Sequence, residues 1–120
     1  ADPVPSKLSN VAAPMYAWFG EALTRCLLSQ DWNLRNTGII VLRTRMLQAC
    51  GMVPQEQITD KDSIPAHSLD IVEFTIGVVA RACDDRIAKV YESALDLLHV
   101  LATNYVAQLL KAPKAQVDEE

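Results

Sequence analysis

Apolar side chains recur at intervals of three and four residues along four stretches of this 120-residue chain, which is the spacing of one face of an α-helix. The pattern predicts helices from about Pro14 to Ser29, from about Asp31 to Cys50, from about Pro65 to Cys83, and from after Asp85 to about residue 111. The second is apolar on more than one side, which is typical of a helix packed between two neighbours. The buried faces expected for the first and third helices are Met15, Phe19, Ala22, Leu23, Cys26 and Leu27, and Leu69, Val72, Ile76, Val79 and Cys83.

Residues with strong turn preferences mark the ends of these helices. Pro14 fits a first helical turn, where its missing N–H costs nothing. Asp31 is expected to cap the second helix, and Gly51 to end it, with Pro54 three residues later. We therefore expect an irregular lead-in over residues 1–13, a helical domain over residues 14–111 with repeats at 14–51 and 65–111, and a solvated acidic tail over residues 112–120.

The two helix pairs are related to each other by an offset of 54 residues. This offset places Asp31 on Asp85 and Arg35 on Lys89, and it aligns apolar positions of the second and fourth helices. The period exceeds the roughly 40–47 residues of HEAT and armadillo repeats because of the polar loop at 51–65. The sequence thus predicts an all-α fold, two antiparallel helix pairs stacked as HEAT-like repeats in an α-solenoid fragment. A plain four-helix bundle is the alternative.

Composition and charge argue against several classes of function. Half of the residues are hydrophobic but only 6% are aromatic, and the net charge of −4 argues against a general nucleic-acid or membrane binder. The chain has no apolar run of membrane length. Cys26, Cys50 and Cys83 form no CxxC or Cys/His cluster, so reduced, buried thiols of a cytosolic protein are expected. His67 and His99 are isolated and no nucleophile or phosphate-loop motif appears, so we expect no metal, no cofactor and no enzymatic activity.

The turns within the helix pairs supply the candidate binding surface. Each is a hairpin between antiparallel helices, so all of them fall on one edge of a helical stack. Trp32 is an aromatic side chain of the kind that anchors interfaces, and Arg35, Arg86 and Lys89 add a basic strip that suits an acidic protein partner. In the alternative interpretation, Trp32 folds back beside Trp18 and the cations are ordinary solvated charges.

Two segments resemble a known family of helical arrays. Residues 19–35 resemble the opening repeat of TOG domains, HEAT-type arrays that bind tubulin, in which the first turn carries a Trp followed closely by an Arg, here Trp32 and Arg35. Residues 80–95 resemble the second repeat, where the turn is followed by Val-x-x-x-Ala-Leu. The corresponding residues are Val90, Ala94 and Leu95. The pattern is most similar to the divergent TOG domain of the ciliary-tip centrosomal protein, and a similar array occurs in one mitogen-activated kinase kinase kinase.

The resemblance implies a non-catalytic tubulin-binding module of a microtubule-, centriole- or cilium-associated protein of the cytoplasmic cytoskeleton. A scaffold or homo-oligomerisation module without tubulin affinity is the alternative. Two repeats are fewer than the roughly three that a solenoid needs to cover its core, so Leu109, Leu110 and the outer face of the last helix pair would stay bare. We expect the isolated chain to self-associate, or to belong to a longer protein whose next repeat covers this face.

Overall fold

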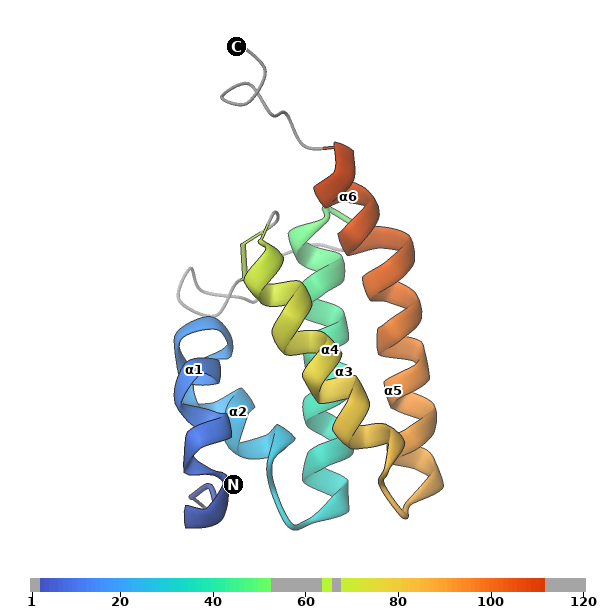
Figure 1. Ribbon diagram of the computed structural model, residues 1–120. Coiled ribbons are helices and arrows are strands. Elements are labelled where there is room, and N and C mark those ends of the chain that lie inside the picture. Colours follow the sequence, from blue (N-terminus) through green and yellow to red (C-terminus); the bar gives the residue numbers. More distant parts are fainter. Residues whose placement is uncertain (1–2, 53–63, 66–67, 112–120) are drawn as a thin grey trace.

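The computed structural model describes residues 3–52, 64–65 and 68–111, and these form helices and turns without a strand. The acidic tail expected at 112–120 and most of the loop expected at 51–65 lie outside the described residues. The elements, shown in Figure 1, are η1 (Ser6–Leu8), α1 (Ser9–Phe19), α2 (Glu21–Leu27), α3 (Trp32–Ala49), α4 (Leu69–Cys83), α5 (Ala88–Val100), the π-helical turn η3 (Leu101–Tyr105) and α6 (Val106–Lys111). The all-α prediction is confirmed.

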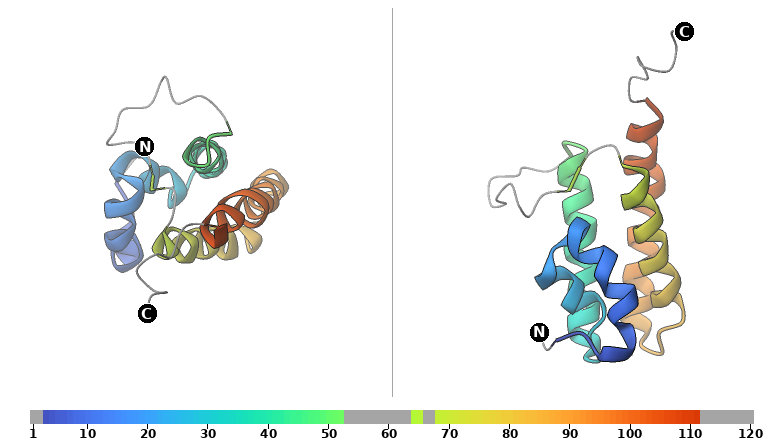
Figure 2. Two further views of the ribbon diagram at one scale, coloured as in Figure 1. Left: turned by 90° about the horizontal axis from the view of Figure 1, so that it is seen from above. Right: turned by 60° about the vertical axis from the view of Figure 1, so that its left-hand side comes forward.

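Helix α3 packs between α2 and α5, as its apolar residues on more than one side predict (Figure 2). α2 with α3 and α4 with α5 are the two antiparallel pairs of the stack. The helices of the first pair come close together at Gly38, where an added Cβ would lie 3.1 Å from both the Cβ of Cys26 and the backbone nitrogen of Leu27. Gly38 therefore allows the backbones of α2 and α3 to come together. Gly77 of α4, in contrast, has open space around it and allows no such close approach.

The amino-terminal region differs from the expected irregular lead-in. Residues 6–13 are helical, and Pro14 lies inside α1 rather than in its first turn. Burial explains the difference, because Ala12, Met15 and Phe19 follow one another at helical spacing and are at most 4% exposed. Burial of this face in the core outweighs the cost of one proline within the helix.

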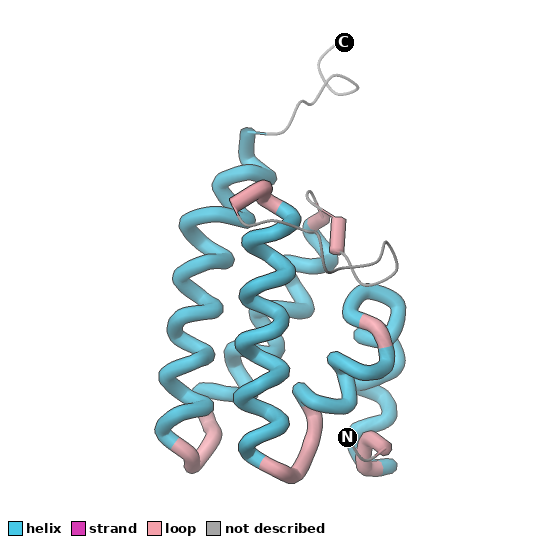
Figure 3. Tube along the Cα trace, turned by 180° about the vertical axis from the view of Figure 1, so that it is seen from behind, coloured by secondary structure: helices cyan, strands magenta, loops and turns pink. Residues whose placement is uncertain are grey.

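Gly20 divides the expected first helix into α1 and α2. Its φ of +82° lies in a region that glycine adopts without steric cost. Its N–H donates to the carbonyl of Tyr16 at 3.0 Å, and its own carbonyl accepts the N–H of Thr24 at 3.1 Å. α1 and α2 therefore form a hairpin, and η1 returns to the same end of the molecule as the α2–α3 and α4–α5 turns (Figure 3).

The buried face of α4 is rotated relative to the predicted face. Leu69 and Ile76 are 73% and 52% exposed, and Cys83 is also exposed. The sequence of α4 is apolar on two sides, so contacts with neighbouring parts of the fold determine which side is buried. One such contact is a perpendicular packing of the Phe19 and Phe74 rings with centroids 6.4 Å apart. The side chains that are buried are Ile71, Thr75, Val78, Val79 and Ala82.

The three cysteines are free thiols, but they are not the buried core residues that were expected. Cys83 is exposed because of the rotation of α4, and Cys26 and Cys50 are half-buried. Partial burial raises the pKa of the Cys50 thiol above its ordinary value. The thiols therefore differ in accessibility.

The two repeats correspond at an offset of 56 residues, so the predicted offset of 54 is wrong by two. The N-caps of α3 and α5 are Asp31 and Ile87. Asp31 caps α3 as predicted, with its carboxylate accepting the N–H of Asn33 at 2.9 Å. Asp85 lies two residues before its helix cap, and its carboxylate accepts the N–H of Ile87 at 3.0 Å. The two aspartates thus occupy different positions in their turns, so an alignment that pairs Asp31 with Asp85 shifts one repeat against the other by two residues.

Cap residues fix the ends of α3 and α4. Gly51, at φ +75°, donates its N–H to the carbonyl of Gln48 at 3.0 Å, and Met52 donates to the carbonyl of Leu47 at 2.8 Å. This Schellman arrangement confirms the predicted glycine stop. α4 starts at Leu69, later than predicted, because the hydroxyl of Ser68 caps its first turn.

The outer face of the last helix pair is bare, as expected. Tyr91, Leu95 and Leu98, spaced as one stripe of α5, are each more than 40% exposed, and Leu110 is 69% exposed. Leu109, expected to be bare as well, is half-buried. An apolar stripe of this kind is typical of a surface that packs against another helix.

Candidate binding site at the turn end

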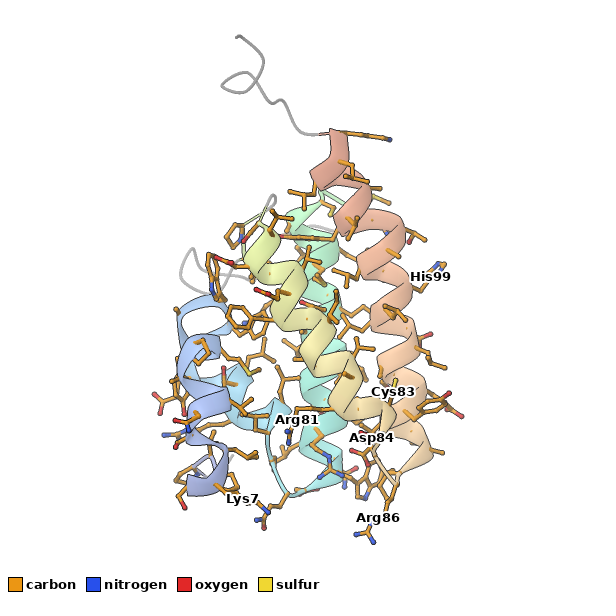
Figure 4. The ribbon with its side chains drawn as sticks, in the orientation of Figure 1. Lys7, Arg81, Cys83, Asp84, Arg86 and His99 are labelled. Atoms are coloured by element: carbon orange, nitrogen blue, oxygen red, sulfur yellow. The ribbon has the colours of Figure 1, made fainter. Side chains whose placement is uncertain are left out.

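The α2–α3 turn, the α4–α5 turn and η1 meet at one end of the molecule, which we call the turn end (Figure 4). A pocket of about 780 Å³ opens among them. Ligand pockets of proteins occupy roughly 300–1,000 Å³, so this volume is sufficient for a specific ligand. The candidate site is therefore a concave surface rather than a flat edge of turns.

The inner wall of the pocket is apolar. Six of the side chains that line it are at most 7% exposed, so they belong to the hydrophobic core and present only a small surface to the pocket. Three others, closer to the solvent, are half-buried. The nine residues are Leu27, Leu28, Ile39, Val78, Ala82 and Val90, and then Leu8, Trp32 and Ile87.

The rim of the pocket is basic. Lys7, Arg81 and Arg86 are exposed, and none of them forms an ion pair with another residue in the part of the chain that the structure describes. In Figure 4, Lys7 and Arg86 lie at the turn end on opposite sides, and Arg81 lies between α2 and α4. Asp84 is the exposed acidic residue of the rim. The lining as a whole carries four cationic and two anionic side chains, in a chain whose net charge is −4.

Arg35 joins the two turns by hydrogen bonds. Its Nε donates to Oδ2 of Asp85 at 2.7 Å and its Nη2 donates to Oδ1 at 3.1 Å, a bidentate ion pair. Its Nη1 donates to the backbone carbonyls of Ser29 and Gln30, both at 3.0 Å. The Arg35 side chain is 24% exposed and that of Asp85 is 7% exposed. The guanidinium therefore fixes the first turn against the second and has little surface left for a partner.

The electrostatics of Asp85 follow from this pairing. The hydrogen bonds from Arg35 hold the pKa of the Asp85 carboxyl below its usual range, in opposition to burial, which raises it. The N–H of Ile87 and the charge of Arg86 lower this pKa further. Asp85 is consequently an ionised group whose charge is already neutralised within the site.

The structure brings three of the four predicted site residues together around the pocket. Trp32 is half-buried, packs against the core and lines the pocket, so it is neither fully free nor fully folded away. Arg86 is exposed on the rim, and Arg35 is held by Asp85. Lys89 is exposed in the first turn of α5 and is not part of the pocket lining.

Sequence reasoning missed two cations of the site. Lys7 belongs to a segment that was expected to be irregular, and Arg81 lies in the last turn of α4, outside the predicted turn. Arg81 could have been recognised in the sequence because it lies close to the end of the predicted third helix, on the side opposite to the predicted buried face. Lys7 gave no local signal, because only the α1–α2 hairpin brings it to the turn end.

Within the described residues, no three His, Cys, Asp or Glu side chains are grouped so that they could hold a metal ion. In the same part of the chain, no helix has both the length and the apolar character needed to cross a membrane.

The sequence model of the family described as "Centrosomal protein CEP104, TOG domain" matches residues 10–118. Among curated proteins, mitogen-activated protein kinase kinase kinase 1 of Mus musculus is 27% identical over 113 residues, and that of Homo sapiens is 28% identical over 113 residues. Each match covers 82% of this chain and 8% of the relative, so the chain spans a small part of those proteins.

Two solved structures share the fold. The structure titled "CEP104 TOG domain" matches with a TM-score of 0.71 and 23% identity, over 92% of this chain and 40% of that chain. "Structure of the TOG domain of human Cep104" matches with a TM-score of 0.69 and 18% identity, over 91% of this chain and 38% of that chain. These likenesses establish a TOG-type helical fold, of which the chain spans less than half the solved length.

Proposed function

Because this chain belongs to the CEP104 TOG-domain family, we propose that it is a tubulin-binding module that recognises its partner through the turn end. The mechanism is recognition without catalysis. The partner meets a preformed surface, and affinity comes from burial of an aromatic anchor and from complementary charge. We further propose that the parent protein acts at the cytoskeleton, at microtubules, centrioles or cilia.

The observation that carries this proposal is the position of Trp32 between the fixed turns. Its ring packs against the core on one side and lines the pocket on the other. An aromatic side chain held in this way loses little conformational entropy when a partner covers it. We propose Arg35 as a positioning residue of the same site, since its hydrogen bonds to Asp85 hold the turns together.

Arg86 and Lys89 supply the charge that the partner would meet. Both are exposed. Arg86 lies in the turn between α4 and α5, and Lys89 lies in the first helical turn of α5. Exposed cations of this kind mainly raise the association rate with an acidic protein and orient it. The proposal therefore assigns orientation to Arg86 and Lys89, and anchoring to Trp32.

A second candidate function is a scaffold that forms homo-oligomers without tubulin affinity. The exposed stripe of Tyr91, Leu95 and Leu98 on α5 favours it, because a second copy would cover this apolar face. The stripe lies outside the pocket lining, so the two functions use different surfaces.

Co-sedimentation with unpolymerised tubulin at low salt tests the proposal. Trp32→Ala should weaken binding by about 2 kcal/mol, or roughly thirtyfold. The matched control is Tyr16→Ala, which removes an exposed aromatic ring of α1 away from the pocket. Circular dichroism must show unchanged helicity in both variants. Equal binding by Trp32→Ala and the wild type would contradict the proposal, and a dimer that binds no tubulin would support the scaffold.

A further inference from the structure

Two cations that line the pocket at the turn end, Lys7 and Arg81, have no role in the tubulin-binding surface proposed above. We propose that this pocket binds a short acidic segment of a protein partner, with one apolar side chain inserted against its inner wall. The inference rests on the proposed function in one respect, namely that a protein partner approaches the turn end. The chemical class of the segment follows from the pocket itself.

The apolar requirement comes from the inner wall. Trp32 and Ile87 line the pocket and are half-buried, so they offer apolar surface that a ligand can cover. Leu28, Ile39 and Val78, between 2% and 7% exposed, add a small area to it. Burial of one apolar side chain against such a surface is favourable roughly in proportion to the area removed from water. A purely polar ligand would leave this surface unused.

The acidic requirement comes from the rim. Asp85 is neutralised by Arg35, so the charges left to attract a ligand are those of Lys7, Arg81 and Arg86, opposed by Asp84. The rim is therefore positive although the chain as a whole is negative. A partner segment with carboxylates on both sides of its apolar residue complements this arrangement.

The separation of the cations favours an extended segment over a compact anion. Lys7 and Arg86 lie on opposite sides of the turn end and Arg81 lies between α2 and α4 (Figure 4). Cations that converge on one point would suit a single phosphate, whereas cations spread around a rim suit carboxylates spaced along a peptide. A nucleic-acid strand would meet the same cations, but its backbone offers no apolar group for the inner wall.

The test measures binding of a fluorescein-labelled peptide, Glu-Asp-Phe-Glu-Glu, to the full chain by fluorescence anisotropy. Two control peptides separate the requirements: Glu-Asp-Ser-Glu-Glu lacks the apolar side chain, and Lys-Lys-Phe-Lys-Lys reverses the charge. The protein variants are Arg81→Glu and Lys7→Glu on the rim, with Lys111→Glu as the matched control at the far end of α6. All three are exposed positions, so the fold should persist.

The expected result is binding of the first peptide alone, weakened roughly tenfold or more by Arg81→Glu or Lys7→Glu and unchanged by Lys111→Glu. Equal binding of the serine peptide, equal binding of labelled oligothymidylate, or an effect of Lys111→Glu as large as that of Arg81→Glu would overturn the inference. So would no peptide binding at all. Tubulin binding is measured on the same variants. A wild-type chain that binds the peptide but no tubulin refutes the proposed function alone, and one that binds tubulin but no peptide refutes the pocket alone.

Discussion

The hydrogen bonds between Arg35 and Asp85 predict a strong energetic coupling between the two turns. Arg35→Ala removes a bidentate ion pair and two bonds to backbone carbonyls, and it leaves the buried Asp85 carboxylate with the N–H of Ile87. Removing one partner of a fully buried pair costs about 3–5 kcal/mol. Since the Arg35 side chain is 24% exposed, we expect about 2–3 kcal/mol for each single variant.

The coupling is measured by a double-mutant cycle of Arg35→Ala and Asp85→Ala, with the free energy of unfolding taken from urea titration followed by circular dichroism. We expect a coupling energy of about 1.5–2.5 kcal/mol. Glu21 and Arg25 provide the matched control, because they form an ion pair one turn apart on α2 with side chains 62% and 35% exposed. An exposed pair of that kind contributes only about 0.3–0.5 kcal/mol.

Acid provides a second measurement of the same coupling. The folded pKa of Asp85 is lowered, so the pair stabilises the fold above the unfolded carboxyl value of about 4. This contribution is lost as the pH falls through the lowered folded pKa. A coupling no larger than that of Glu21 with Arg25, or one that does not fall in acid, would refute the assignment of Arg35 as the residue that fixes the turns.

Three further predictions concern the rest of the fold. Gly38→Ala should destabilise by about 1–3 kcal/mol because its Cβ would lie 3.1 Å from the backbone of α2, whereas Gly77→Ala, in open space within a helix, should stabilise by about 0.5–1 kcal/mol in urea unfolding. Burial raises the pKa of Tyr105 to about 12, so the wild type should lose stability between pH 10 and 12 relative to a Tyr105→Phe variant; parallel titrations would contradict this. Iodoacetamide, followed by mass spectrometry, should label exposed Cys83 before Cys50, whose thiol is half-buried and has a raised pKa; the opposite order would contradict the burial described.

Local signals in the sequence were sufficient for the helices with clear caps. The predicted bounds of α3, Asp31 and Cys50, each lie within one residue of its observed ends, because capping by Asp31 and Gly51 is a short-range interaction. The hairpin at Gly20 was missed, since a glycine within an apolar pattern is compatible with a continuous helix. The early start of α1 was also missed. Pro14 suggested the first turn of a helix, but burial of the apolar face of α1 outweighs the cost of a proline inside it.

The site depends on contacts that the local pattern does not contain. The partner of Arg35 lies 50 residues away, so its role as a fixed connection between turns is visible only in three dimensions. The rotation of α4 has a similar origin, because both of its faces are apolar and neighbouring helices decide which is buried. Trp32 was found from its type and position alone, and Lys7 reaches the turn end only through the α1–α2 hairpin.

The hairpin at Gly20 has a practical consequence for assays. It places η1 at the turn end, while α6 stands at the opposite end of the molecule (Figure 1). A fluorescent domain fused ahead of η1 would therefore sit beside the pocket and compete with any partner for space. The same reporter attached beyond α6 would leave the pocket open, so labelled protein for imaging or surface immobilisation should carry its tag at the carboxyl end.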